Sequence, residues 1–157
     1  MQALDEIVWA VDPQNDTLDG LVGYLNQFAS QFFENTNLRC RLEIPETLPA
    51  LVLPAEVRHA LFLAVKEALN NALKHAQAAE VCVSVTVTAA VLEIDVADNG
   101  RGFDAGQTHA RSGGNGLENM RKRMAKLGGD CCLTSVPGKG TELKFRVKVE
   151  ASYNRTN

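Results

Sequence analysis

The sequence predicts an α+β fold, a two-layer sandwich in which helices cover one face of a mixed sheet. Segments with helical spacing of apolar residues and segments with apolar–polar alternation are interleaved along the 157 residues. No internal repeat or low-complexity tract interrupts them. Helices and strands mixed in this way bury their apolar sides best when the helices pack on the sheet.

The composition is that of an ordinary globular domain, with 45% hydrophobic and 22% charged residues. The net charge of −3 gives no indication of a nucleic-acid surface or of direct contact with an anionic membrane. No apolar stretch reaches bilayer length, and the first residues lack the basic start of a signal peptide. The four cysteines show no C-x-x-C pair and no zinc-like spacing from a histidine, so we interpret them as buried, reduced thiols.

Two helices are expected before the first strand. Residues 1–12 form an amphipathic helix that ends at Pro13. Asp16 or Thr17 can cap the second helix, which extends to about Asn35. The apolar stripe of the first helix consists of Leu4, Ile7, Val8 and Val11. The apolar residues of the second are Leu18, Leu21, Leu25, Phe28 and Phe32.

The rest of the chain alternates between strands and helices. Pro54 begins a long helix that reaches about His75. A later helix, with Leu117 and Met120 on its apolar stripe, ends at Gly128 and Gly129. The strands share apolar–polar alternation and are expected at RCRLEI (39–44), VCVSVTVT (81–88), VLEIDVAD (91–98), CCLTSV (131–136) and TELKFRVKV (141–149).

The long helix carries an unusual polar stripe on one face. This stripe consists of Glu67, Asn71, Lys74 and His75. The opposite face is apolar and contains Phe62, Val65, Leu69, Ala72 and Leu73. Taken alone, the stripe is most simply a solvated face with weak side-chain pairs. The alternative is a magnesium–nucleotide site, with oxygens of Asn71 and Glu67 on the cation and Lys74 on a phosphate.

Two glycine clusters follow. Asp98 ends a strand and leads into Gly100 and Gly102, which suits close approach of a ligand to the backbone. Gly114 and Gly116 precede the helix at Leu117, where free backbone amides can bind phosphate oxygens. In isolation the first cluster is better explained as an ordinary Asn-Gly turn, and the second as a flexible linker with a helix N-cap. Neither cluster is a Walker A loop or a Rossmann fingerprint.

In this order, EALNNALKHA, DNGRGF, GNGLENMRKRM and PGKGTELKF resemble the nucleotide boxes of the GHKL ATPase superfamily, which has the Bergerat fold. The likeness is greatest to the catalytic domains of sensor histidine kinases of the nitrate/nitrite-sensor class and covers about residues 4–149. It implies three parts: the end of a dimerisation or linker helix at 1–12, the ATP-binding catalytic domain at 13–150 and a flexible tail at 151–157.

The resemblance implies a role in nucleotide binding for each matching residue. Asp98 accepts a hydrogen bond from the adenine amino group, and Thr141 supports the same end of the nucleotide. Asn71 binds Mg²⁺ between the phosphates, Lys74 contacts phosphate, and His75 lies beside the ribose or the phosphates. The backbone groups assigned to the site are those of Gly100 and Gly102 against the nucleotide, and Gly114, Gly116 and Leu117 at the ATP lid.

The resemblance also implies a reaction. Glu67 orients or deprotonates the acceptor histidine, and Lys74 stabilises charge on the transferred phosphoryl group. In the family the acceptor lies upstream of the nucleotide domain, and none of His59, His75 and His109 matches it. The expected partners are therefore the dimerisation and phosphoacceptor helices of a full-length kinase and a response regulator. The domain is expected in the cytoplasm, and the resemblance allows the full-length protein to be anchored in the inner membrane.

Other kinds of protein share these boxes. A GHKL serine kinase of the anti-sigma-factor type needs no upstream dimerisation helix, so the helical segment 1–12 favours the sensor kinase. A non-catalytic interaction domain could keep the fold, but intact Asn71, Asp98 and both glycine clusters argue against it. A purely structural domain is the remaining alternative.

Overall fold

The computed structural model describes residues 2–106 and 116–150, with side chains from residue 4 onward. Its helices are α1 (Gln2–Val11), the short 3-10 helix η1 (Pro13–Asn15), α2 (Leu18–Phe33), α3 (Ala55–His75) and α4 (Gly116–Lys126). Its strands are β1 (Arg39–Glu43), β2 (Glu80–Thr88), β3 (Val91–Asp98), β4 (Asp130–Ser135) and β5 (Thr141–Lys148). Every predicted element is present, with ends that differ by a few residues.

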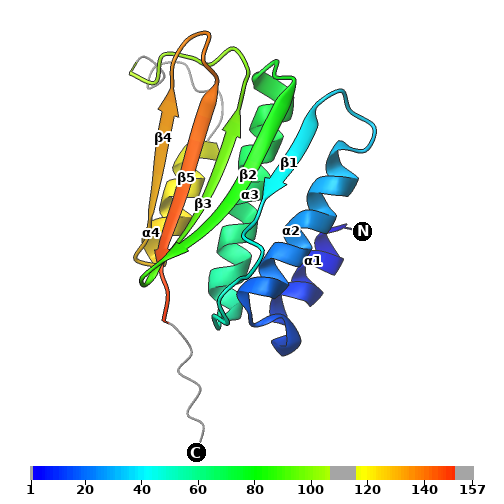
Figure 1. Ribbon diagram of the computed structural model, residues 1–157, viewed down its shortest axis with the longest axis vertical. Coiled ribbons are helices and arrows are strands. Elements are labelled where there is room, and N and C mark those ends of the chain that lie inside the picture. Colours follow the sequence, from blue (N-terminus) through cyan, green and yellow to red (C-terminus); the bar gives the residue numbers. More distant parts are fainter. Residues whose placement is uncertain (1, 107–115, 151–157) are drawn as a thin grey trace, which may run out of the picture.

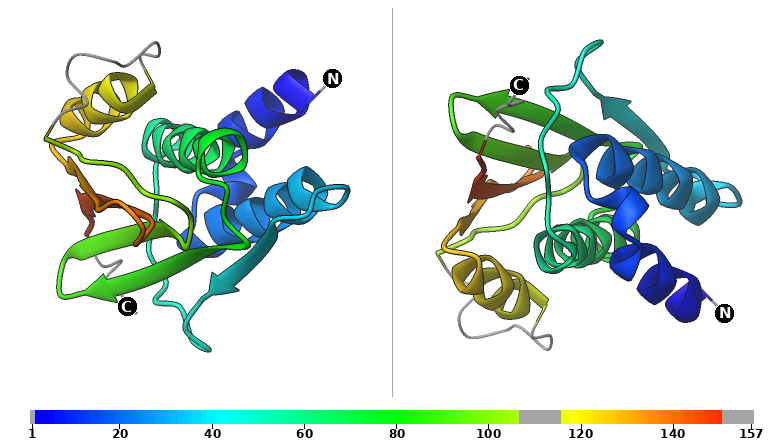
Figure 2. Two further views of the ribbon diagram at one scale, coloured as in Figure 1. Left: turned by 90° about the horizontal axis from the view of Figure 1, so that it is seen from above. Right: turned by 90° about the horizontal axis from the view of Figure 1, so that it is seen from below.

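The five strands form one mixed sheet in the order β1-β2-β3-β5-β4 (Figure 1). β1 is parallel to β2, and the other neighbours are antiparallel. Helices α2, α3 and α4 lie on one face of the sheet, and α1 lies outside this layer against α3 (Figure 2). The predicted two-layer α+β architecture is confirmed.

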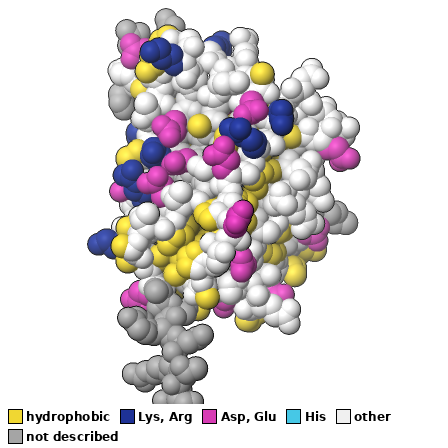
Figure 3. All heavy atoms as spheres, in the orientation of Figure 1, with side chains coloured by type: hydrophobic (Ala, Val, Ile, Leu, Met, Phe, Trp, Pro, Cys, Tyr) yellow, Lys and Arg dark blue, Asp and Glu magenta, His cyan; other side chains and the backbone are white. Residues whose placement is uncertain are grey.

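The core lies between the sheet and the three helices. Alternate residues of the central strands face it, and all of Val81, Val83, Val85, Leu92, Ile94 and Val96 are buried. On the opposite face, acidic and basic side chains lie side by side (Figure 3). Lys144 there pairs with Glu93, Asp95 and Glu142. One face of the sheet is therefore packed against the helices and the other is exposed to solvent, as in many antiparallel sheets.

Helix α2 begins where the sequence predicts. The side chain of Thr17 accepts a hydrogen bond from the Gly20 amide at 3.0 Å. Of the two predicted caps, Asp16 and Thr17, the structure therefore has Thr17. In α3 the predicted buried face holds except at Leu73, which is 37% exposed. With about 100° between successive helical residues, Leu73 falls at the border of the buried stripe rather than in its centre.

Helix α1 contacts the domain through a face that the apolar pattern did not indicate. Glu6, Trp9 and Ala10 are buried against α3 and its neighbours. The indole of Trp9 stacks on Tyr24 with ring centroids 4.1 Å apart. The predicted stripe of Leu4, Ile7, Val8 and Val11 is instead between 54 and 65% exposed.

The cysteines depart in part from expectation. Cys40, Cys82 and Cys131 are half-buried, but Cys132 is exposed. Because side chains alternate along a strand, neighbours such as Cys131 and Cys132 must point to opposite faces of the sheet. The exposed thiol, that of Cys132, therefore lies on the solvent-exposed face of the sheet.

Candidate nucleotide-binding site

A row of polar side chains crosses the helix-covered face at one end of the sheet. Ser135 in β4 is in register with Thr141 in β5, and Thr141 is in register with Asp98 in β3. The row two residues further into the sheet is apolar, formed by Leu133, Leu143 and Val96. The change from apolar to polar marks the edge of the core and the start of a surface that can bind a polar ligand.

Asp98 is a half-buried hydrogen-bond acceptor. Its carboxylate Oδ1 accepts a hydrogen bond from the Gly100 amide at 2.9 Å. Partial burial raises the pKa of the Asp98 carboxyl, while hydrogen bonds from the Gly100 and Thr141 amides act to lower it. These two amides leave other lone pairs of the carboxylate free, so Asp98 can accept a further hydrogen bond from a ligand amino group.

The loop after Asp98 is fixed to its surroundings by its own polar groups. The Asn99 side-chain oxygen accepts from the amides of Ala79 at 3.0 Å and Glu80 at 2.9 Å. Arg101 donates from its backbone amide to the Ala76 carbonyl at 2.7 Å, and from Nε to the His75 carbonyl at 2.9 Å. The carboxyl end of α3 and the end of β3 therefore form one connected unit.

The glycines of this loop are required by the protein itself. A Cβ atom at Gly100 would collide with the carbonyl oxygen of Ala76. Gly102 has φ of +60°, and a Cβ there would collide with the carbonyl oxygen of Val136. The packing of the loop accounts for both glycines, and their contact with nucleotide stays a prediction.

The polar stripe of α3 becomes more exposed toward the end of the helix. Glu67 and Asn71 are half-buried, and Lys74 and His75 are exposed. A Cβ atom at Gly116 would collide with the Glu67 carboxylate, so the first residue of α4 lies directly against this acid. The structure therefore brings Glu67 to the point where the predicted lid joins α4.

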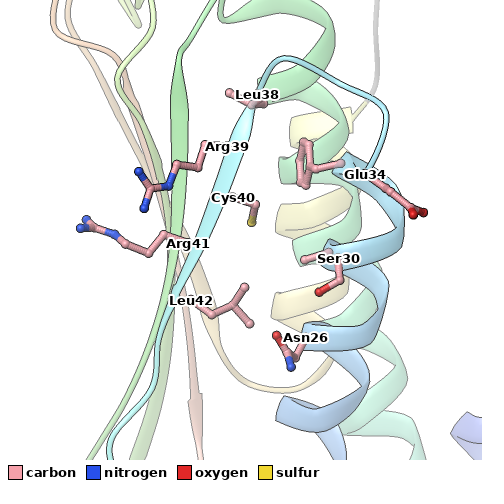
Figure 4. A pocket seen from close by; sticks show the side chains of 10 residues that line it. Asn26, Ser30, Glu34, Leu38, Arg39, Cys40, Arg41 and Leu42 are labelled. Atoms are coloured by element: carbon pink, nitrogen blue, oxygen red, sulfur yellow. The ribbon is translucent and has the colours of Figure 1, made fainter.

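The cavities of the described part of the molecule include two beside helix α2. One, of about 360 Å³, is lined by residues of α2, α3 and α4 that include Glu67 and Gly116. The other, of about 490 Å³, lies between α2 and β1, with Asn26, Ser30 and Cys40 on its walls (Figure 4). Neither is lined by Asn71 or Asp98. Residues 107–115 of the predicted lid, Gly114 included, lie outside the described residues. A common cavity for Asn71 and Asp98 therefore stays a prediction.

Sequence reasoning missed three residues of this region. Ser135 contacts Thr141, and Asn99 and Arg101 hold the glycine loop. Asn99 and Arg101 lie within the motif DNGRGF, so the motif was the available signal. Nothing in the sequence distinguishes Ser135 from any other serine in a strand.

Residues 56–151 match the family model of the histidine kinase-, DNA gyrase B- and HSP90-like ATPases. The chain belongs to this family. The matched segment begins in α3 and includes every residue of the polar row. The chain is an ATP-binding catalytic domain of the sensor histidine kinase kind, as two bacterial relatives also indicate.

Those relatives are bacterial sensors. The chain is 32% identical over 130 residues to the sensor histidine kinase LiaS of Bacillus subtilis, covering 83% of this chain and 34% of LiaS. It is 34% identical over 136 residues to the nitrate/nitrite sensor NarQ of Escherichia coli, covering 85% of this chain and 23% of NarQ. The chain thus spans about a third of LiaS and about a quarter of NarQ.

A solved ATP-binding domain shares the fold. The domain of PrrB from Mycobacterium tuberculosis superimposes with a TM-score of 0.64 at 28% identity, over 86% of this chain and 98% of that one. In the described ranges, no helix is long and apolar enough to cross a membrane. The same residues contain no group of three or more histidine, cysteine and acidic side chains that could hold a metal by themselves.

Proposed function

We propose that this chain binds ATP with Mg²⁺ and transfers the γ-phosphoryl group to a histidine on a dimerisation helix of a longer sensor kinase. The observation that supports this most is the polar row that ends at Asp98, within a segment that matches the ATPase family. Asp98 and Thr141 would hold the adenine end. Asn71 and Lys74 would hold the phosphate end with His75, Gly114, Gly116 and Leu117.

Magnesium fits the residues that are present. Mg²⁺ keeps several waters and usually takes one or two protein oxygens together with substrate phosphates. The half-buried Asn71 amide on α3 supplies one such oxygen, and the nucleotide phosphates would supply others. When bound, the cation would offset the charge on the phosphate oxygens.

Glu67 is the candidate acid–base group of the transfer. It is half-buried, lies against Gly116 and lines the cavity between α2, α3 and α4. A carboxylate beside the lid is suited to orient an incoming imidazole or to accept its proton. Lys74, exposed at the end of α3, can approach the phosphates as a point charge.

The larger protein sets the context of this activity. Residues 1–12 would be the end of a longer helix and residues 13–150 the catalytic domain. The expected tail, residues 151–157, lies outside the described residues. The partners would be the phosphoacceptor helices of the kinase and a response regulator whose aspartate then receives the phosphoryl group. The domain would work in the cytoplasm, where ATP is available, while other parts of the protein receive the signal.

The test is phosphoryl transfer in trans. The purified chain is mixed with γ-labelled ATP, Mg²⁺ and the dimerisation helices of its own gene. Label should appear on those helices, stable in alkali and lost in acid, whereas the chain alone should take up little. Glu67→Gln should slow the transfer and leave ADP binding intact. Acid-stable label on a serine would instead support the anti-sigma-factor type of kinase, and absence of both label and nucleotide binding would contradict the proposal.

A further inference from the structure

The Ser135 hydroxyl contacts three polar groups near the candidate adenine end. Ser135 is 9% exposed, at the last position of β4. Its Oγ accepts a hydrogen bond from the Phe103 amide at 2.9 Å. The same Oγ lies 3.1 Å from the carbonyl oxygen of Gly140 and 2.9 Å from Oγ1 of Thr141.

These three contacts determine where the hydroxyl protons lie. A serine hydroxyl has one proton to donate and two lone pairs. The Phe103 amide can only donate and the Gly140 carbonyl can only accept, so Ser135 must direct its proton to Gly140 to satisfy both. The remaining lone pair of Ser135 then accepts from the Thr141 hydroxyl.

The opposite assignment is less favourable. If Ser135 donated to Thr141, its oxygen would face the Gly140 carbonyl at 3.1 Å with no proton between them. That carbonyl would keep only a long hydrogen bond of 3.5 Å from the Val136 amide. A buried acceptor left in this way costs free energy, which favours the first assignment.

We propose that Ser135 is a positioning residue that fixes the Thr141 hydroxyl as a hydrogen-bond acceptor toward the base of a bound nucleotide. The inference rests on the proposed nucleotide function. Because the Thr141 hydroxyl donates its hydrogen bond to Ser135, it offers only lone pairs to a ligand or to a water held by that ligand. Asp98, next to it in register, also only accepts.

Two adjacent acceptors select a base edge with an amino group. Adenine carries an amino group at its 6-position, whereas hypoxanthine carries a carbonyl there and would bring acceptor against acceptor. A hydroxyl free to rotate could donate to that carbonyl and so tolerate it. Ser135 therefore sharpens the preference for adenine without touching the nucleotide.

The experiment compares the dissociation constants of ADP and inosine diphosphate by calorimetry on the whole chain. Ser135→Ala should lower the preference for ADP about fivefold to tenfold, the value of one hydrogen bond. Ser135→Cys, whose thiol is a weak donor and acceptor, should act in the same direction and serves if the alanine variant does not fold. The matched control is Thr134→Ala, an exposed hydroxyl one position earlier, which should leave the preference unchanged.

A second measurement separates positioning from general damage. In a Thr141→Val background, Ser135→Ala should change the preference no further, because its effect passes through the Thr141 hydroxyl. Additive losses, or an unchanged preference in Ser135→Ala and Ser135→Cys, would overturn the inference. Failure of the wild-type chain to bind ADP would instead contradict the proposed function, so the two failures are distinguishable.

Discussion

At the scale of single residues, Asp98 meets two opposing demands. A carboxylate that binds an amino group must stay charged, yet partial burial raises its pKa above the ordinary 3.8. The folded chain therefore holds this proton more tightly than the unfolded chain. The stability that the group contributes is greatest at low pH and is lost as the pH rises through the window just above 3.8.

Asp98→Asn should separate binding from stability. At pH 7 the variant carries no buried charge, so its melting temperature should equal or exceed that of the wild type. The difference should shrink as the pH falls toward about 4, where aspartate is protonated. ADP affinity should fall at least about tenfold, because a charged acceptor is lost. Thermal melts at several pH values and ADP calorimetry check this, and a clearly lower melting temperature at pH 7 would contradict it.

The thiols offer a second prediction at the same scale. Burial raises the pKa of Cys40 and of Cys131 to about 11. At pH 8 only about one thiol in a thousand at these positions is ionised, so both should react slowly with iodoacetamide. The exposed Cys132 should react first, as peptide mapping can show. Cys132→Ser should remove the fast phase, and unfolding in guanidinium should make all the thiols reactive.

The residues of the candidate site were predictable from the sequence where a motif carries them. Asp98, Gly100 and Thr141 lie in motifs with fixed order. Ser135 was not predictable, because its importance depends on the neighbours that the sheet register brings to it. The contact between Glu67 and Gly116 was equally hidden, since 49 positions separate the two residues in the printed sequence.

At the scale of elements, a buried arginine joins α1 to the rest of the domain. Arg58 in α3 is fully buried. Its Nη2 donates to the Ala10 carbonyl and to Asp16 Oδ1, both at 2.7 Å, and its Nε donates to the Leu53 carbonyl at 3.1 Å. Three segments that precede α3 therefore converge on one guanidinium. Nη1 is buried without a partner among the residues the structure describes.

Arg58→Met should destabilise the fold by about 3 kcal/mol, because the aliphatic stem is kept but buried acceptors lose their donor. The guanidinium lies 5.3 Å from the ring centroid of Trp9, the single tryptophan of the chain. Urea unfolding followed by tryptophan fluorescence therefore reports both the stability and the environment of α1. The control is Arg39→Met, an exposed arginine whose loss should change stability by less than about 0.5 kcal/mol. An equal effect of both variants would contradict the anchoring role.

Elements of this kind could be predicted only in part. The cap of α2 and the buried faces of β2 and β3 follow from local pattern, so they were correct. The side of α1 that packs on the domain was not, because its contacts depend on residues such as His59 and Lys66, which pair with Glu6. A charged residue reads as exposed until its partners across the fold are known.

At the scale of the whole molecule, alternation along the chain established the number of strands but not their order. β5 lies between β3 and β4, so the last hairpin places its second strand inside the sheet. β1 and β2 are parallel neighbours in the sheet, although α3 separates them in the sequence. Such pairings depend on which edges remain open as the chain folds, and apolar periodicity holds no information about that.

Ligand binding should be visible as stabilisation of the whole domain. A ligand at one hundred times its dissociation constant adds about 2.7 kcal/mol to the free energy of unfolding. For a domain of this size, that corresponds to a rise in melting temperature of about 5–10 °C. ADP with Mg²⁺ should give this rise, and ADP with a chelator should give a smaller one.

Asn71→Ala and Asn71→Asp test the metal contribution to that rise. If the Asn71 amide binds the cation, the alanine variant should melt at the same temperature with and without Mg²⁺ in the presence of ADP, because only the metal-dependent part is lost. The aspartate variant should also lose the wild-type response, since an added negative charge changes both the cation and the phosphate contacts. Asn26→Ala, an exposed asparagine on α2, should behave as the wild type does. A full Mg²⁺-dependent rise in both Asn71 variants would remove Asn71 from the site, and the phosphate end would then have to be sought elsewhere on α3.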